Sequence, residues 1–123
     1  MSHEFDQHKP IYRQLVERIC YDIIRGDRLP GEKLASVRTY AFEVGVNVNT
    51  VQRVYQELER ENIVETRRGQ GTFVTTNRER LVKLREDIKT TFIRQFLRDI
   101  ENMGFSKEEI IQTIRMEGEM SND

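Results

Sequence analysis

The fold of this chain is decided by residues 36–75, which read SVRTYAFEVGVNVNTVQRVYQELERENIVETRRGQGTFVT. Apolar residues recur every three or four positions in 37–44 and again in 51–58, the spacing that gives a helix one buried face. Gly45 ends the first segment, and a turn of very few residues leads into the second. Two short helices joined by a tight turn that contains glycine form a helix-turn-helix.

The last part of the same stretch changes from helical to extended periodicity. Residues 63–67 and 72–75 are rich in β-branched and aromatic side chains, and the segment 68–71 between them contains two glycines. This pattern predicts a β-hairpin directly after the second helix. With a hairpin in that position the unit becomes a winged helix-turn-helix.

A further helix is predicted before this motif. Pro10 is suited to a helix start, and Ile11, Leu15 and Ile19 form one apolar stripe. The stripe ends near Gly26, and a Pro-Gly turn signal follows it.

Two more helices are predicted after the motif. The first extends from about Arg78 to Met103, with apolar residues three or four apart, and Gly104 ends it. Ser106 and Glu109 then have the spacing of a capping box, so a last helix is expected to about Gly118.

The fold class is therefore expected to be mainly α with a small β-hairpin wing. We divide the chain into a flexible leader (1–9), a winged helix-turn-helix domain (10–76), a two-helix dimerisation tail (77–118) and a flexible end (119–123). The tail is too short to build a core of its own, so we treat it as an appendage of the winged domain.

The composition is typical of a soluble, largely helical protein. Of 123 residues, 37% are hydrophobic and 33% are charged, and two are prolines. No apolar run approaches the roughly 20 residues needed to cross a bilayer, and the first ten residues lack the apolar stretch of a secretory signal. We expect a cytoplasmic protein that does not contact a membrane.

The sequence offers no constellation of catalytic residues. Cys20 is the only cysteine, and the two histidines, His3 and His8, lie in the polar leader. There is no cluster of metal ligands and no phosphate-binding loop. We therefore expect no enzymatic activity, no metal and no cofactor.

The charge balance alone does not indicate a nucleic-acid partner. The net charge is −1, and residues 1–77 carry 11 Lys or Arg against 11 Asp or Glu. Basic residues nevertheless gather locally, because Glu43 is the only acid between Lys33 and Gln56. Affinity for phosphates would depend on this clustering.

The second helix of the motif carries polar residues opposite its apolar face. A step of about 100° per residue points Asn49 and Arg53 away from the core. Arginine can form paired hydrogen bonds with guanine, and an amide side chain can do so with adenine, so this face suits the DNA major groove. A solvated helix has similar residues, but the turn before it and the hairpin after it favour DNA. The candidate DNA-binding residues are Lys33, Ser36, Arg38, Asn47, Asn49, Thr50, Gln52, Arg53, Arg67, Arg68, Gly69 and Gln70.

The predicted tail is apolar over more than one face. An exposed surface of this kind favours aggregation, and burial against an identical chain removes it from water. Packing back onto the winged domain is the alternative. The candidate dimerisation residues are Leu84, Ile88, Phe92, Ile93, Phe96, Leu97, Ile100, Ile110 and Ile114.

Three segments together resemble the DNA-binding domain of GntR-family regulators. They are Pro30–Arg38, Gly45–Glu59 and Arg68–Val74. The short two-helix tail resembles the YtrA-type subgroup. The resemblance implies a homodimer that binds an inverted-repeat operator in double-stranded DNA, and that represses its own operon and neighbouring transporter genes. It also implies DNA contacts at the positions of Arg38, Asn49, Thr50, Gln52, Arg68 and Gly69.

Two residues depart from the family pattern. Ala35 stands where the family commonly has proline, which should loosen the entry to the second helix. Val48 occupies a position that is often polar or basic in other subgroups, so operator preference is expected to differ.

Three functions can be compared at this stage. The favoured one is a dimeric operator-binding repressor, which would be associated with the nucleoid when bound. The alternative is a winged-helix module for protein–protein interaction, and the third is an enzyme, which the missing chemistry argues against. The sequence does not identify an effector.

Overall fold

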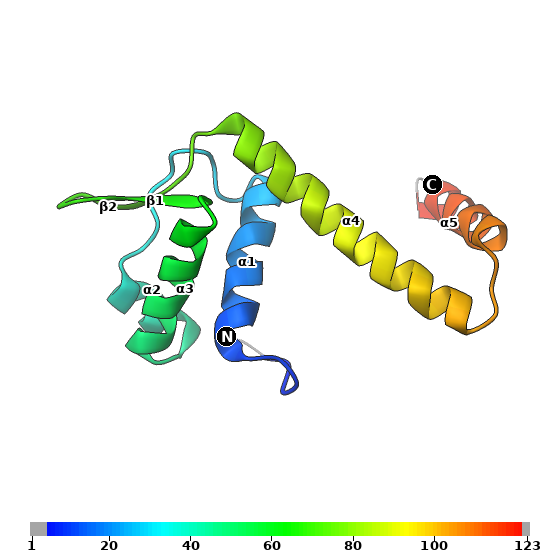
Figure 1. The fold of residues 1–123 in the computed structure, drawn as a ribbon, viewed down its shortest axis with the longest axis horizontal. Helices are drawn as coiled ribbons and strands as arrows, with labels where there is room; N and C mark the ends of the chain where they lie inside the picture. Colours follow the sequence, from blue (N-terminus) through cyan, green and yellow to red (C-terminus); the bar gives the residue numbers. More distant parts are fainter. Residues whose placement is uncertain (1–4, 122–123) are drawn as a thin grey trace. The chain divides into compact units, whose positions relative to one another are not determined.

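The computed structural model describes residues 5–121, which contain five helices and one antiparallel hairpin (Figure 1). In chain order the elements are α1 (Ile11–Arg25), α2 (Val37–Val44), α3 (Val48–Arg60), β1 (Val64–Arg67), β2 (Gly71–Val74), α4 (Arg78–Asn102) and α5 (Lys107–Ser121). This order confirms the expected fold class, mainly helical with a small wing.

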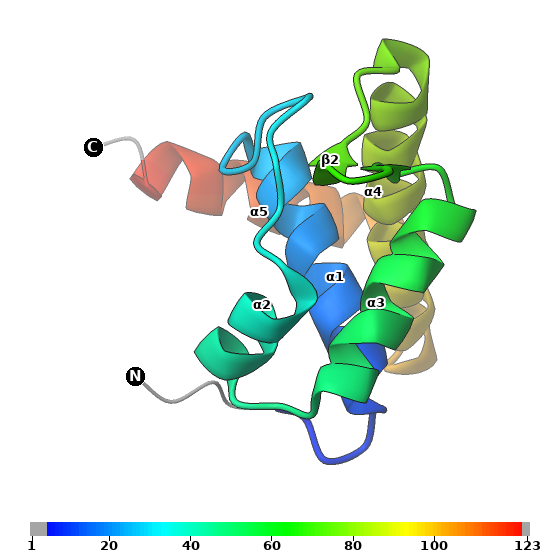
Figure 2. The same cartoon turned by 90° about the vertical axis from the view of Figure 1, so that its left-hand side faces the viewer.

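The core of the winged unit forms where α1 and α2 pack against α3 (Figure 2). Leu15 and Ile19 of α1 are fully buried, as are Val51, Val54 and Leu58 of α3. These residues recur at helical spacing, so each helix buries one stripe and leaves its opposite side in water. The packing thereby fixes which side of α3 is exposed.

Both helices of the central motif begin at capping residues. The Ser36 hydroxyl accepts a hydrogen bond from the Thr39 amide, and the Asn47 side-chain oxygen accepts one from the Asn49 amide. Gly45 ends α2 in the left-handed conformation, at φ 71°. Each cap satisfies an amide that has no partner within its helix.

The two-stranded wing is extended by an isolated β-bridge that the sequence analysis did not predict. β1 and β2 pair antiparallel, with Val64 opposite Val74. Residues 32–34 lie along the other edge of β2, where the Val74 amide donates to the Glu32 carbonyl and the Leu34 amide to the Thr72 carbonyl, both at 2.8 Å. This pairing ties the segment before α2 to the wing.

The chain divides into two compact units, one up to Arg85 and one from Glu86. The division lies inside α4, later than the boundary expected at residue 76. The first turns of α4 join the winged unit because Arg80 donates to the Glu61 carbonyl at 2.7 Å and Arg85 to the Ile24 carbonyl at 2.8 Å.

The prediction for Leu84 needs correction. Its side chain, expected in the dimer surface, is only 6% exposed and belongs to the core of the winged unit. The apolar stripe of α4 is continuous in sequence, so periodicity alone could not distinguish the part that packs internally.

The second unit consists of the rest of α4 and α5. The capping box is present, because the Ser106 amide donates to the Glu109 carboxylate and the Glu109 amide to the Ser106 hydroxyl. α5 continues to Ser121, past the expected end near Gly118, and residues 122–123 lie outside the described part. No helix within residues 5–121 is both long enough and apolar enough to cross a bilayer.

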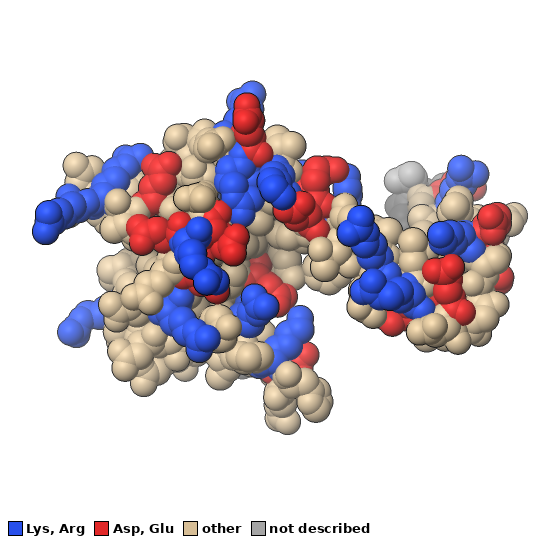
Figure 3. Space-filling view, in the orientation of Figure 1, with Lys and Arg blue, Asp and Glu red and all other residues tan. Residues whose placement is uncertain are grey.

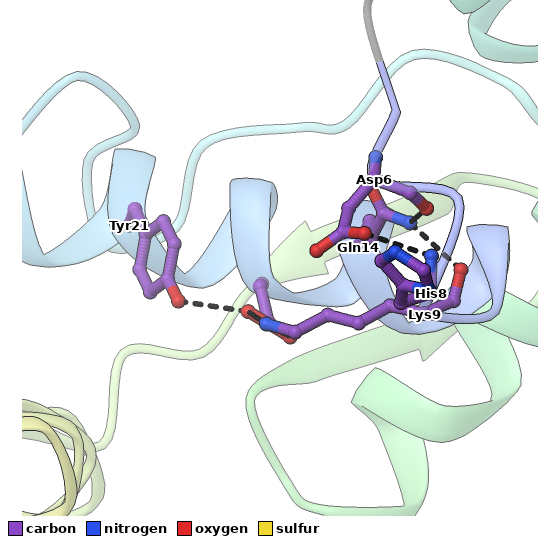
Figure 4. A network of polar contacts seen from close by, with 6 residues as sticks. Asp6, His8, Lys9, Gln14 and Tyr21 are labelled. Atoms are coloured by element: carbon purple, nitrogen blue, oxygen red, sulfur yellow. Dashed lines mark hydrogen bonds and ion pairs between the residues drawn. The ribbon is translucent and has the colours of Figure 1, made fainter. Parts of the chain in front are cut away.

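The described part of the leader, residues 5–9, is hydrogen-bonded to α1 (Figure 4). The Gln14 side chain accepts from the Asp6 amide and donates to the carbonyls of Asp6 and Lys9, at 2.7–2.8 Å. Lys9 lies 3.5 Å from Glu17, which also accepts from the Tyr21 hydroxyl at 2.9 Å. Residues 1–4 of the predicted leader lie outside the described part.

Candidate nucleic-acid interface

Helix α3 presents its polar face to solvent. Asn49, Gln52 and Arg53 are exposed and Thr50 is half-buried, whereas the apolar stripe of the same helix is inaccessible. The structure therefore brings these four candidate residues together on the outer side of one helix. Side chains in this arrangement can reach base edges if the helix enters a major groove.

Arg53 is held by an aromatic ring from a different helix. Its guanidinium carbon lies 3.6 Å from the centroid of the Tyr12 ring, in the first turn of α1. A cation over an aromatic face is attracted by the electron-rich ring. The sequence analysis missed Tyr12, because a tyrosine beside a helix start carries no signal of what the tertiary packing will place against it.

The acidic residue nearest to Arg53 along α3 is engaged elsewhere. Glu57 forms an ion pair and hydrogen bond with Arg60, and this interaction raises the pKa of the Arg60 guanidinium. Arg53 has no ion-pair partner among residues 5–121. Its hydrogen-bond donors thus remain available to a ligand.

Ser36 and Asn47, which were predicted to bind DNA, also have structural roles. Their side-chain oxygens cap α2 and α3, as described above. A capping side chain lies beside the exposed amides of its helix, where an anion is also favoured. Their position is therefore compatible with a nearby phosphate, although their acceptors are already used.

A hydrogen bond from a buried residue of α3 holds the segment that leads into α2. The hydroxyl of Tyr55 donates to the Ala35 carbonyl at 2.6 Å, and burial raises the pKa of Tyr55 to about 12. This bond holds the backbone just before Ser36. Arg38 follows in the first turn of α2, exposed and without an ion-pair partner in the described part of the chain.

The tip of the wing is a glycine-containing turn. The Gln70 amide donates to the Arg67 carbonyl at 2.9 Å, and Gly69 has a φ of 76°, which favours glycine. The Arg67 guanidinium carbon lies 4.3 Å from the centroid of the Phe73 ring, and Arg67 is also paired with Glu65 at 3.9 Å. Arg68 and Gln70 are exposed. Basic side chains project at this tip in Figure 3.

Lys33 belongs to the wing, not to the face of α3. It forms an isolated β-bridge with Phe73, and its stem covers Gly71 so closely that a Cβ there would lie 2.7 Å from the lysine Cε. The absence of a side chain at Gly71 lets Lys33 reach across the hairpin.

The net charge of −1 is compatible with anion binding, because the ion pairs are unevenly distributed over the winged unit. Arg25 and Arg28, at the end of α1 and after it, are both paired with Asp22. In contrast, Lys33, Arg38 and Arg68 have no acidic partner within residues 5–121. Arg67 is paired with Glu65 at 3.9 Å, so the positive charge that remains without an acidic partner at the candidate interface is that of Lys33, Arg38 and Arg68.

Comparison with known proteins identifies the family. The sequence profile described as "Bacterial regulatory proteins, gntR family" matches residues 11–74, which span α1 to the end of the wing. The chain belongs to the GntR family. Members of this family are transcription regulators that bind DNA, so the expectation that the protein is not an enzyme is confirmed.

Similarity to individual GntR proteins extends beyond the DNA-binding domain. The chain is 42% identical to the HTH-type transcriptional regulator YhcF of Bacillus subtilis over 94% of this chain and 95% of YhcF. It is 36% identical to the HTH-type transcriptional repressor YtrA of the same organism, over 86% and 82%. A solved GntR-family regulator from Listeria monocytogenes has a TM-score of 0.87, at 38% identity over 91% and 98% of the two chains. The resemblance to the YtrA-type subgroup is therefore confirmed.

The second unit of this GntR protein has an exposed apolar surface. Phe92, Ile93 and Ile114 are each more than half exposed, and Phe96 is 42% exposed. Ile88, Leu97, Ile100 and Ile110 are half-buried. Further exposed apolar residues, absent from the predicted set, are Met103, Phe105, Ile111, Met116 and Met120.

Proposed function

We propose that this GntR-family protein is a homodimeric repressor that binds an inverted-repeat operator and controls its own operon and neighbouring transporter genes. The observation that carries the proposal is the exposed polar face of α3, with Asn49, Gln52 and Arg53, in the same unit as a wing that carries exposed basic residues. The named repressor YtrA, 36% identical, supports repression over activation. Such a protein works in the cytoplasm, at the nucleoid.

In the proposed complex the first half of α3 enters the major groove. The amides of Asn49 and Gln52 pair with adenine, and the Arg53 guanidinium pairs with guanine. Thr50 reaches a phosphate or a thymine methyl group. Arg38 anchors the backbone at the start of α2, where the helix amides also favour an anion.

The wing makes the second contact. Arg68 and Gln70 approach the sugar-phosphate wall or the minor groove, and Gly69 lets the backbone come close because it has no side chain. Arg67 contacts the Phe73 ring and Lys33 contacts Gly71, so both add charge without a large loss of side-chain freedom.

The tail supplies the second copy of the reader. The apolar side chains of Phe92, Ile93, Phe96 and Ile114 leave water when two tails associate. Two joined domains bind two half-sites whose centres lie about 34 Å apart, or a multiple of that distance. A dimer bound across a promoter excludes RNA polymerase, which is how we expect repression to occur.

Selection of genomic fragments by the purified protein tests the proposal. We expect enrichment of a few fragments that share an inverted repeat, one of them upstream of the gene for this protein. Affinity for the enriched site should fall steeply with salt, because bound phosphates release counterions. A protein that retained no fragment preferentially would instead be an interaction module, and the proposal would be wrong.

A further inference from the structure

We propose that Tyr12 is a positioning residue for sequence recognition: α1 holds the Arg53 guanidinium in the orientation in which it reads a base. This inference rests on the proposed contact of Arg53 with guanine. It adds a residue outside the helix-turn-helix to the determinants of operator specificity.

The packing of α1 restricts the position of the Tyr12 ring. Tyr12 is half-buried in the first turn of α1, the helix whose buried stripe packs on α3. The same turn is fastened by Gln14, which makes three hydrogen bonds to Asp6 and Lys9 (Figure 4). A ring held in this way restricts any side chain that stacks on it.

The type of contact matters as much as its position. Arg53 lies with its guanidinium carbon 3.6 Å from the ring centroid, so Tyr12 uses the face of the guanidinium and leaves the N–H groups at its edge. A carboxylate would occupy those donors. Glu57 is the candidate for such a contact, and Arg60 binds it instead.

The remaining side chains of the groove fit this arrangement. Tyr12, Arg53, Gln56, Glu57 and Arg60 line one open groove on the surface of α1 and α3. Within it Tyr12 engages Arg53, while the Glu57–Arg60 pair occupies the next turn. Each arginine of α3 in this groove thus has one partner, and only Arg53 keeps its donors open.

Pre-organisation of this kind predicts a limited effect. Ordering a flexible side chain at an interface weakens binding by about three- to ten-fold, so a guanidinium that is already ordered avoids this loss. Removal of the ring should therefore reduce discrimination about three- to ten-fold. The loss should be confined to the base pair that Arg53 contacts.

The experiment measures the affinity of the full chain for the selected operator and for a set of variants with each base pair changed in turn. The protein variants are Tyr12→Phe, which keeps the ring, Tyr12→Leu, which keeps apolar volume, Arg53→Ala, and the double variant. Tyr21→Leu is the matched control, because it removes a ring from the same helix and its hydroxyl bonds to Glu17. Thermal unfolding establishes that each variant is folded.

The expected result is specific to one position of the operator. Tyr12→Leu should lose discrimination at the same base pair as Arg53→Ala, Tyr12→Phe and Tyr21→Leu should keep it, and the double variant should resemble Arg53→Ala. Unchanged discrimination in Tyr12→Leu, or an equal loss on every sequence, overturns the role of Tyr12 while the Arg53 contact stands. If Arg53→Ala itself discriminates normally, the proposed base contact is wrong and this inference falls with it.

Discussion

At the scale of single residues, the candidate interface depends on residues that hold other residues in position. Tyr55 donates a hydrogen bond to the Ala35 carbonyl, and the Tyr12 ring contacts the Arg53 guanidinium. Gly71 has no side chain, so Lys33 can lie against it. Each effect depends on one atom or ring, so each can be tested by one substitution. Two predictions belong to this scale.

We expect Tyr55→Phe to lower the free energy of unfolding by about 1 kcal/mol, because the Ala35 carbonyl loses its donor. Burial raises the pKa of Tyr55 from 10 to about 12, so the native state favours the protonated phenol. Its contribution is therefore complete below pH 10 and is lost as the pH rises through about 12. Chemical denaturation at pH 7 and at rising alkaline pH measures both effects. A variant that matched the wild type at neutral pH would show that the hydrogen bond adds nothing.

We expect Gly71→Ala to destabilise the protein by about 1–3 kcal/mol through backbone strain at a φ of 122°, with an additional loss from displacing Lys33. Gly26→Ala is the control, since Gly26 also has a positive φ but a Cβ there meets no atom within 4 Å. Urea denaturation gives both values. Equal losses at the two sites would contradict a close contact between Lys33 and Gly71.

At the scale of elements, short helices and a short hairpin depend on their ends and edges. α2 has eight residues, so its capping residue and its C-terminal glycine set its limits. The segment before α2 is joined to the wing by an isolated β-bridge, which connects the two parts of the candidate interface. A third prediction separates capping from DNA contact.

We expect Asn47→Ala to cost about 1 kcal/mol of stability, because the cap on the Asn49 amide is lost. Asn47→Asp should keep the cap and the stability, since aspartate caps as well as asparagine, but its charge lies at the end of α3 that faces phosphates. Denaturation and operator affinity should therefore respond differently to the two changes. If Asn47→Asp bound the operator as tightly as the wild type, this end of α3 would not approach the DNA.

At the scale of the whole molecule, the proposed function depends on association of two chains. The second unit exposes large apolar residues on α4 and α5, including Phe92, Ile93 and Ile114. Exposed apolar residues of this number favour a site of association. The two proposed readers are linked only through it.

We expect Phe96→Glu to convert the dimer to a monomer at micromolar concentration, because a charge would be buried in the interface. Operator affinity should fall by about 10²-fold or more as the second half-site contact becomes independent. Gln95→Glu, which adds the same charge at the neighbouring position, should remain dimeric. Sedimentation and gel-shift titration measure the two effects. A dimeric Phe96→Glu protein would place the interface elsewhere.

Local patterns explain how much of this molecule could be predicted. The helix-turn-helix, the hairpin and the capping box at Ser106 and Glu109 follow from periodicity and turn chemistry, which involve neighbours in sequence. The face of α3 was also predictable, since three or four apolar positions fix its orientation. The β-bridge at Lys33 was not, because its partner Phe73 lies far along the chain and the residues around Lys33 carry no strand pattern.

The sequence by itself determined the fold class, the order of the elements and the polar face of α3, because each depends on residues within one or two helical turns of each other. Only the tertiary structure decided that Tyr12 meets Arg53, that Lys33 joins the wing, and that Leu84 belongs to the winged unit. Those contacts join residues that are distant in sequence. Their geometry depends on how whole helices pack, which no local pattern specifies.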